Sequence, residues 1–302
     1  MFNKELILKI LSKGLLKLNT QPGNTKMTNT QDDMLTDLDF ITQSIENEFK
    51  KNTVKIATEG TYPPYNFKNE LGDLEGLEID IGNEICKRLK IDCEWVETEW
   101  NKLIPGLEEH NYDVVISGMD KMDGRESGIT KFTKCYVADF KQFGVLGRNS
   151  LSDVLWKTWD IDMNDTQIDT KVINELVSVF KDKTIGVQKS TIHEIWLNRY
   201  LYNKIKVISY DNVIELNEAL VGEDIDAILS DVGSIIDLMD SGDGLDVMFT
   251  GPRFYGYGIG SVVRKEDAVT IDSWNKTIDD MNKDGTTSKI SKKWFGRDIS
   301  LP

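Results

Sequence analysis

Short apolar runs alternate with amphipathic stretches along most of this chain. The runs at 54–58 (VKIAT), 113–117 (DVVIS) and 184–188 (TIGVQ) are typical of buried strands. Amphipathic segments lie between such runs; the one at 77–90 places apolar residues at 77, 81, 85 and 89, on one face of a helix. This alternation predicts an α/β fold of mainly parallel sheets flanked by helices. The stretch 150–183 carries two helical patterns around an acidic middle, so we expect two helices there.

The residues that follow the predicted strands are candidates for a binding site, because ligands bind beyond the carboxyl ends of parallel strands. Five strands are followed by such residues: Glu59, Tyr62 and Tyr65; Trp100; Ser117, Gly118, Met119 and Asp120, with Arg125 in the next turn; Lys189, Ser190, Thr191 and His193; and Asp231. Each also has an ordinary structural explanation. Asp231 can be a helix N-cap, and Thr191 has capping-box spacing with Glu194. Trp100 can belong to the core, and Arg125 can be solvated.

Considered together, these residues suit a zwitterionic amino acid. The guanidinium of Arg125 can bind a carboxylate through two hydrogen bonds, and the free N–H groups at the helix start at Thr191 add to anion binding. A carboxylate such as Asp231 suits an ammonium group. The flat side chains of Tyr62 and Trp100 can sandwich the ligand's side chain. The sequence therefore favours an amino-acid site over five unrelated surface features.

The first 53 residues differ from the rest and are predicted to be an N-terminal extension. Lys4, Lys9, Lys13 and Lys17 recur at helical spacing opposite leucines, which is typical of a basic amphipathic helix that contacts a membrane surface or a partner. These lysines interrupt the apolar core that a secretory signal peptide needs. An atypical export or anchoring segment and an ill-defined extension both remain open. Residues 19–31 have the composition of a polar linker.

Charge and cysteine content exclude several classes of function. The formal net charge of −15 is unsuited to nucleic acid, whose phosphates require clustered Lys and Arg. No run approaches the ~20 apolar residues of a membrane span. Cys86 and Cys93 are seven positions apart without a histidine nearby, so a zinc site is disfavoured, and either a disulfide or two buried thiols fits the spacing. We expect neither a metal nor a cofactor.

Several segments in chain order carry a resemblance to a known family: ATEGTYPPYNF (57–67), GLEIDIGNEICKRLKIDCEWV (76–96), LIPGL (103–107), DVVISGMDKMDGRE (113–126), FTKCY (132–136), IGVQKST (185–191), IDAILSD (225–231) and DGTTSKISKKWFG (284–296). Residues 54–298 resemble the periplasmic polar amino-acid-binding proteins of ABC importers, especially the arginine and lysine/arginine/ornithine binders. The resemblance implies a two-lobed type II periplasmic-binding-protein fold, with residues 54–138 and 252–302 in one lobe and 139–251 in the other. Two hinge crossovers join the lobes, which close around the ligand.

The resemblance also implies a role for each matching position. Arg125 and Thr191 hold the α-carboxylate, Asp231 holds the α-ammonium with help from Ser117 or the region of Gly118 and Met119, and Tyr62 and Trp100 stack on the side chain. Glu59 and Asp120 match acids of the basic-amino-acid and arginine binders. Cys86 and Cys93 match a disulfide of the lysine/arginine/ornithine binders, which implies an oxidising compartment. Lys189 departs from the family pattern, and if it points inward it repels a cationic ligand.

The function implied is that of a periplasmic or extracytoplasmic solute-binding protein. It captures a cationic L-amino acid, arginine before lysine, ornithine or histidine, and as a monomer delivers it to an ABC permease. An amino-acid-sensing domain is one alternative. Another is an enzyme similar to cyclohexadienyl dehydratases on the same scaffold, which needs a general acid such as Glu59 or Asp120. The sequence shows no nucleophile–base pair, so we expect no enzyme.

Overall fold

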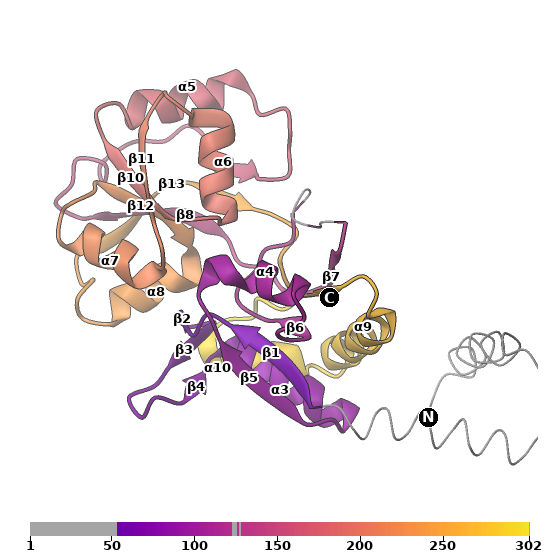
Figure 1. The fold of residues 1–302 in the computed structure, drawn as a ribbon. Coiled ribbons are helices and arrows are strands. Elements are labelled where there is room, and N and C mark those ends of the chain that lie inside the picture. Colours follow the sequence, from indigo (N-terminus) through magenta and orange to yellow (C-terminus); the bar gives the residue numbers. More distant parts are fainter. Residues whose placement is uncertain (1–52, 123–125, 127, 302) are drawn as a thin grey trace, which may run out of the picture. The chain divides into compact units, whose positions relative to one another are not determined.

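The computed structural model of this 302-residue chain describes residues 53–122, 126 and 128–301. The amphipathic segment predicted within residues 1–53 and the predicted ligand residue Arg125 lie outside these ranges, so both stay predictions. The side chains of residues 268 and 269 are also not described. From Thr53 onward the chain clusters into one unit, and its elements form two main sheets with helices on their faces (Figure 1).

The first main sheet has the strand order β5-β1-β6-β14-β7. Its strands are β1 (Val54–Thr58), β5 (Cys93–Glu97), β6 (Val114–Val115), β7 (Thr130–Val137) and β14 (Ile259–Arg264). β1 runs parallel to β5 and β6, whereas β14 is antiparallel to β6 and β7. A small sheet of β2 (Thr61–Tyr62), β3 (Asn66–Lys68) and β4 (Leu74–Glu75) follows β1 in the chain. Parallel pairing in the first main sheet is thus limited to β5, β1 and β6.

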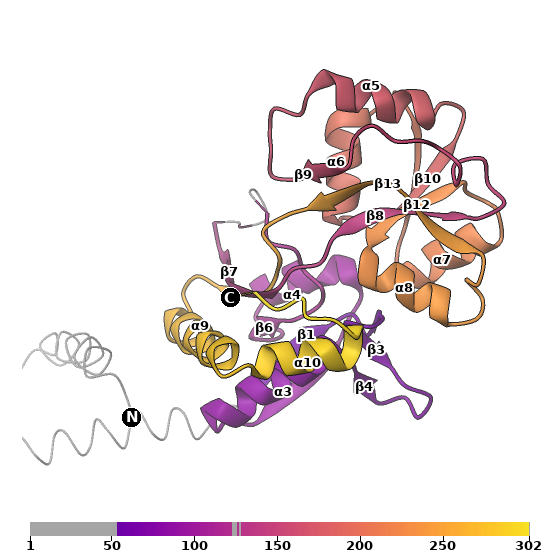
Figure 2. The same ribbon diagram turned by 180° about the vertical axis from the view of Figure 1, so that it is seen from behind.

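Helices cover both faces of this sheet because neighbouring residues of a strand point to opposite sides. Ile56 belongs to the apolar cluster that includes residues of α3 (Leu77–Leu89), α9 (Ala268–Lys283) and α10 (Thr286–Phe295). Ala57, the next residue, packs in a separate cluster with residues of the 3₁₀ turn η1 (Trp100–Lys102) and α4 (Leu103–Glu108). The views from the front and from behind show α3 and α10 side by side (Figures 1 and 2).

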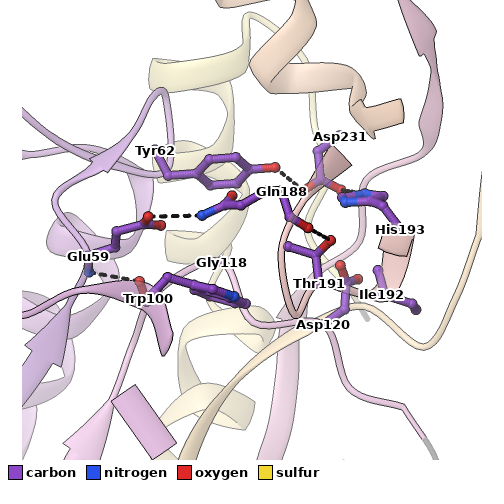
Figure 3. Close-up of a pocket in the computed structure, with 11 residues that line it drawn as sticks. Glu59, Tyr62, Trp100, Gly118, Asp120, Gln188, Thr191, Ile192, His193 and Asp231 are labelled. Atoms are coloured by element: carbon purple, nitrogen blue, oxygen red, sulfur yellow. Dashed lines mark hydrogen bonds and ion pairs between the residues drawn. The ribbon is translucent and has the colours of Figure 1, made fainter. Parts of the chain in front are cut away.

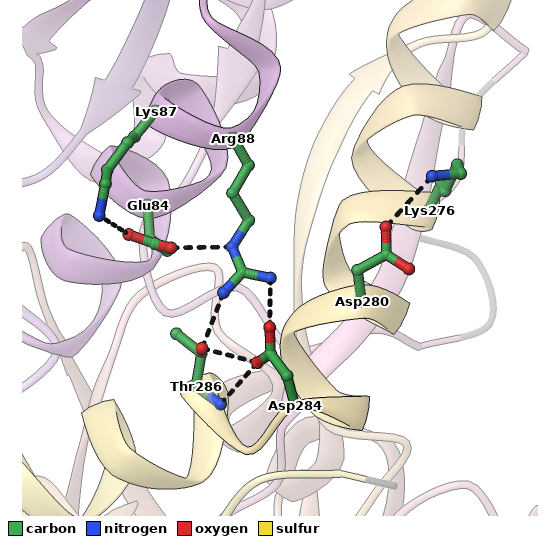
Figure 4. A network of polar contacts seen from close by, with 7 residues as sticks. All are labelled: Glu84, Lys87, Arg88, Lys276, Asp280, Asp284 and Thr286. Carbon is green, nitrogen blue, oxygen red and sulfur yellow. Dashed lines mark hydrogen bonds and ion pairs between the residues drawn. The ribbon is translucent and has the colours of Figure 1, made fainter. Parts of the chain in front are cut away.

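Polar contacts join α3 to the turn between α9 and α10 (Figure 4). Arg88 lies 2.8 Å from Glu84 on its own helix and 2.8 Å from Asp284. It also donates to the Thr286 hydroxyl at 2.8 Å.

α3 ends next to this contact, where Lys90 adopts left-handed backbone with φ 56°. The reversal brings Cys86 and Cys93 together in a disulfide with a Cα–Cα distance of 6.2 Å, which confirms the pairing.

The second main sheet has the strand order β11-β10-β12-β8-β13-β9. Its strands are β8 (Lys141–Leu146), β9 (Asp160–Asp162), β10 (Thr184–Gln188), β11 (Lys206–Tyr210), β12 (Ala227–Asp231) and β13 (Val247–Tyr255). The helices α5 (Thr170–Val179) and α6 (Ile192–Leu201) share one apolar cluster with it, and α7 (Val213–Val221) and α8 (Val232–Asp240) share another. The predicted α/β class is confirmed, although β8 runs antiparallel to both of its neighbours.

The chain passes between the two main sheets twice, after β7 and again between β13 and β14. β8 begins at Lys141, so the first passage spans residues 138–140, and β13 continues in the second sheet as far as Tyr255. The lobe boundaries predicted from the sequence, 54–138 with 252–302 and 139–251, remain a proposal. No helix within the described ranges is both long and apolar enough for a membrane span.

The expectation of two helices in 150–183 was wrong for its first half. The structure has turns and the strand β9 there, and α5 is the single helix of the segment. Asp162 Oδ1 accepts from the N–H of Asn164 at 2.9 Å, and Asp165 Oδ1 accepts from the N–H of Gln167 at 2.7 Å. Such local side-chain bonds to the backbone compete with helix formation.

Candidate ligand-binding site

Residues from the strand ends of both main sheets converge on one pocket (Figure 3). Its lining is Glu59, Tyr62, Trp100, Ser117, Gly118 and Asp120 from the part of the chain before β7, and Gln188, Thr191, Ile192, His193 and Asp231 from the part around the second sheet. Met119, also predicted for the site, packs in the core with Phe132 and Leu103 instead. Lys189 is exposed and does not line the pocket. The sequence did not single out Gln188 and Ile192.

The segments after β1 and β6 form one wall of the pocket. Glu59 follows β1, and its N–H donates to the Ser117 hydroxyl at 2.9 Å, which ties the two segments together. Gly118 adopts left-handed backbone with φ 59°. A Cβ atom at Gly118 would lie 3.0 Å from Tyr62 Cδ1, so glycine both permits this turn and leaves room for the ring. Tyr62 stacks on Tyr65 with ring centroids 5.2 Å apart, which fixes the position of its hydroxyl.

Asp231 forms part of the opposite wall. It ends β12 and occupies the N-cap position of α8, yet its side chain makes no capping hydrogen bond. The carboxylate instead accepts from the Tyr62 hydroxyl and lies 3.0 Å from Lys141 Nζ. His193 Nε2 lies 3.8 Å from the same carboxylate. The capping explanation therefore does not account for this residue, whose carboxylate faces the pocket.

Thr191, by contrast, does cap a helix. Its side chain accepts from the Glu194 N–H at 3.4 Å at the start of α6 and donates to the Gln188 carbonyl at 2.6 Å. Glu194 accepts from the N–H of Ser190 at 2.6 Å, one residue before the N-cap, so its contact differs from that of a standard capping box. Ser190 has φ 59°, in a region that favours glycine. Thr191 thus has a structural role in addition to its place in the pocket lining.

Lys141, the first residue of β8, is a site residue that the sequence did not reveal. Its side chain is 0% exposed, and its Nζ lies 2.7 Å from Asp120 and 3.0 Å from Asp231. The same nitrogen donates to the Asp139 carbonyl at 3.0 Å. Burial opposes the charged form of this lysine, but the attraction of Asp120 and Asp231 prevails and raises its pKa. We therefore treat Lys141 as a cation that contacts the pocket residues Asp120 and Asp231 without lining the pocket itself.

Glu59 has a different environment, in which its side chain contacts neutral groups. Gln188 Nε2 donates to Glu59 Oε1 at 2.9 Å, and this bond joins the two walls. Burial raises the pKa of Glu59 to about 7, although the hydrogen bond from Gln188 opposes the shift. Burial also raises the pKa values of Asp120 and Asp231, against the attraction of Lys141.

Glu78 stabilises the Gly118 turn in the wall of the pocket. It is fully buried in α3, where it accepts from the N–H of Gly118, from the Tyr136 hydroxyl and, at 2.8 Å, from Asn66 Nδ2. Burial raises the pKa of Glu78 to about 7, and the three hydrogen bonds oppose this shift. Glu78 thus holds the Gly118 turn in place without lining the pocket itself.

The raised pKa values of Glu59 and Glu78 predict a pH-dependent stability. Both carboxyls bind a proton more tightly in the folded chain than in the unfolded chain, so their stabilisation is complete below the unfolded value of 4.5 and is lost as pH rises through about 7. The free energy of unfolding should therefore fall between these values, by up to ~1.4 kcal/mol per pH unit for each group. Urea unfolding at pH 5, 6 and 7 measures the slope.

The Glu59→Gln variant should show a shallower slope, since one carboxyl with a raised pKa is removed. Glu97→Gln is a suitable control, because Glu97 is exposed and pairs with Lys68 at 2.6 Å away from the pocket lining. A free energy of unfolding that rises from pH 5 to pH 7 would contradict the prediction.

The pocket is too small for an amino acid as it stands. Its volume is about 10 Å³, room for about one water molecule. Three contacts connect its walls: Tyr62 to Asp231, Gln188 to Glu59, and Lys141 to Asp120. A ligand therefore enters only when the walls separate. Within the described ranges, no group of three or more His, Cys, Asp or Glu side chains could hold a metal ion.

Two main sheets linked by two chain passages, with polar residues of both around one pocket, define the class of two-lobed ligand-binding proteins. Residues 54–297 match the sequence model of the bacterial extracellular solute-binding proteins, family 3, and the chain belongs to this family. The match covers every described strand and helix, including all residues of the pocket.

Named relatives and solved structures agree with this assignment. The chain is 30% identical to the lysine/arginine/ornithine-binding periplasmic protein of Escherichia coli over 80% of its own length and 87% of that protein. Among solved structures, an ancestral arginine-binding protein bound to arginine has a TM-score of 0.68 at 28% identity, covering 81% of this chain and 98% of that one. A periplasmic His/Glu/Gln/Arg/opine family-binding protein from Silicibacter pomeroyi, in complex with lysine, has a TM-score of 0.67 at 27% identity and covers 83% and 100%.

Proposed function

We propose that this protein captures a cationic L-amino acid outside the cytoplasm and delivers it to an ABC permease, with arginine favoured over lysine, ornithine and histidine. The observation that carries the proposal is that three buried carboxylates, Glu59, Asp120 and Asp231, line one pocket beside Tyr62 and Trp100, while Lys141 compensates only one of their charges. Buried carboxylates are costly beside a neutral ligand and favourable beside a cation. Relatives named for lysine, arginine and ornithine and a neighbour bound to arginine support this choice.

Several pocket residues have a role in the proposed complex. Asp231 binds the α-ammonium, since its carboxylate faces the pocket and makes no capping bond. The N–H groups at the start of α6 after Thr191 receive the α-carboxylate, together with Arg125 as predicted from the sequence. Tyr62 and Trp100 offer aromatic faces that attract a guanidinium. Glu59 contributes negative charge for the distal cation.

Closure of two lobes is the proposed conformational change. The three contacts between the pocket walls join residues on either side of the passage at 138–140, so they break when the lobes open and are replaced in part by ligand contacts. We place the protein in the periplasm or an equivalent extracytoplasmic space as a monomer. Residues 1–53 are proposed to contact the membrane surface.

Calorimetric titration with arginine, lysine, ornithine, histidine, citrulline and phenylalanine tests the proposal. Citrulline has nearly the shape of arginine without its charge, so arginine should bind at least ~30-fold more tightly, a difference of about 2 kcal/mol. Binding only of neutral or aromatic amino acids would contradict the cationic assignment. A cyclohexadienyl substrate incubated with the protein should remain unchanged by NMR; turnover would identify an enzyme, with Glu59 as the first candidate for its general acid.

A further inference from the structure

Lys141 places a protein cation where a ligand cation could otherwise bind. Its three ammonium protons have three oxygen acceptors, on Asp120 at 2.7 Å, on Asp231 at 3.0 Å and on the Asp139 main chain at 3.0 Å. The lysine and both aspartates are at most 3% exposed. An ion pair so far from water is poorly screened, so the lysine strongly offsets the charge of its partners.

The backbone holds Lys141 in this position. Lys141 is the register partner of Asp231 in the antiparallel pair of β8 and β12. Asp120 belongs to the other side of the pocket, where it forms an isolated bridge with Ile259. The lysine therefore lies between acids from both main sheets. A ligand can displace it only by breaking the start of β8 or by leaving an ammonium group buried without partners, and both are costly.

The pocket carboxylates consequently differ in how much charge they present to a ligand. Asp120 and Asp231 share Lys141, whereas Glu59 accepts a hydrogen bond from Gln188, which is neutral. Asp231 retains a role at the α-ammonium, which every amino acid carries. Discrimination by side-chain charge then falls to Glu59, for which the described part of the chain supplies no cationic partner.

We propose that Lys141 is a specificity-determining residue: it neutralises Asp120 within the protein, so that Glu59 recognises the ligand's side-chain cation. This inference rests on the proposed function and sharpens it. It limits the ligand to one positive side-chain charge, because the second carboxylate near the side chain is already compensated. It also changes the role assigned to Asp120, from a direct ligand contact to the partner of Lys141 in an internal ion pair.

A double-mutant cycle tests the pair, with arginine and citrulline as ligands and calorimetry as the measurement. Asp120→Asn leaves Lys141 with Asp231 as its remaining carboxylate partner and adds one net positive charge at the pocket, so arginine binding should weaken at least about tenfold more than citrulline binding. Lys141→Met exposes the Asp120 charge and should shift the affinity ratio at least about tenfold toward arginine. The double variant D120N/K141M removes both charges, and its ratio should return to within about threefold of the original.

Two results would overturn the inference. If the double variant keeps the full arginine loss of D120N, then Asp120 contacts the ligand cation directly. If K141M weakens arginine and citrulline equally, the lysine has only a structural role. Should K141M fail to fold, the comparison of D120N with the double variant still decides, because recovery of arginine binding is predicted only for a neutralising pair.

A matched control uses the ion pair of Lys276 and Asp280 on α9, which are 3.1 Å apart and mostly exposed (Figure 4). The variants K276M, D280N and their combination make the same charge changes away from the pocket lining. They should leave the ratio of arginine affinity to citrulline affinity unchanged.

The test also separates the two proposals. If the unaltered protein binds no amino acid, the proposed function fails. If it binds arginine but the double variant D120N/K141M does not recover that binding, only the role of Lys141 is refuted.

Discussion

Replacing Asp231 with asparagine should lower the affinity for every free α-amino acid by at least ~100-fold, or about 2.7 kcal/mol. The physical reason is that the α-ammonium loses a buried carboxylate and faces a neutral amide, which provides hydrogen bonds but no charge compensation. The loss should be the same for arginine and citrulline, since both carry this ammonium. Calorimetry on the variant measures it, and Nα-acetylarginine should fail to bind even the unaltered protein.

Asp169→Asn is the matched control for this change. Asp169 is also an N-cap residue, at the start of α5, but its side chain accepts from Lys171 N at 2.8 Å and does not line the pocket. Asparagine caps helices about as well as aspartate, so the control should bind like the unaltered protein. Thermal unfolding should show that D231N remains folded. Arginine binding by D231N within about threefold of the original would refute the assigned role.

The second large effect is expected from Glu59→Gln. Arginine binding should weaken by at least ~30-fold, while citrulline binding should change by less than about threefold. Glutamine keeps the size of the side chain and can still pair with Gln188, so the charge is the main difference. The ratio of the two affinities, measured by calorimetry at pH 8, isolates that charge because Glu59 is then mostly ionised, its pKa being about 7.

The exposed Glu97 is again the control, and E97Q should bind both ligands like the unaltered protein. An equal loss of arginine and citrulline affinity in E59Q would mean that the residue supports the pocket structurally. Unchanged arginine affinity would assign the charge recognition to another acid and would contradict the inference from Lys141 as well.

Much of the architecture follows from local patterns. The four-residue spacing of Leu77, Ile81 and Ile85 predicts an amphipathic helix, and all three are fully buried in α3. The apolar runs at 54–58 and 184–188 are strands β1 and β10. These elements were predictable because periodic burial depends on residues only a few positions apart. The segment 150–169 was not, because acidic side chains there bond to nearby N–H groups instead of leaving the backbone free for a helix.

The candidate site was partly predictable for a topological reason. Residues after parallel strands gather at one edge of a sheet, and Glu59, Asp120 and Asp231 indeed line one pocket. The sequence could not distinguish capping from ligand binding at a helix start. Thr191 caps α6 with its side chain, whereas Asp231 at α8 does not. That distinction depends on side-chain direction, which neighbouring strands and the opposite wall determine.

Lys189 and Lys141 show most clearly what the sequence could predict and what it could not. Sequence comparison drew attention to Lys189 because it departs from a family pattern, yet this residue is exposed. Lys141 begins an apolar run, KQFGVL, and nothing local marks it as part of a site. The amino-acid sequence alone determined most strands and helices and the acids at the strand ends, since these depend on local periodicity. Tertiary structure alone decided which cation meets those acids, because the register of β8 against β12 places Lys141 between residues 21 and 90 positions away.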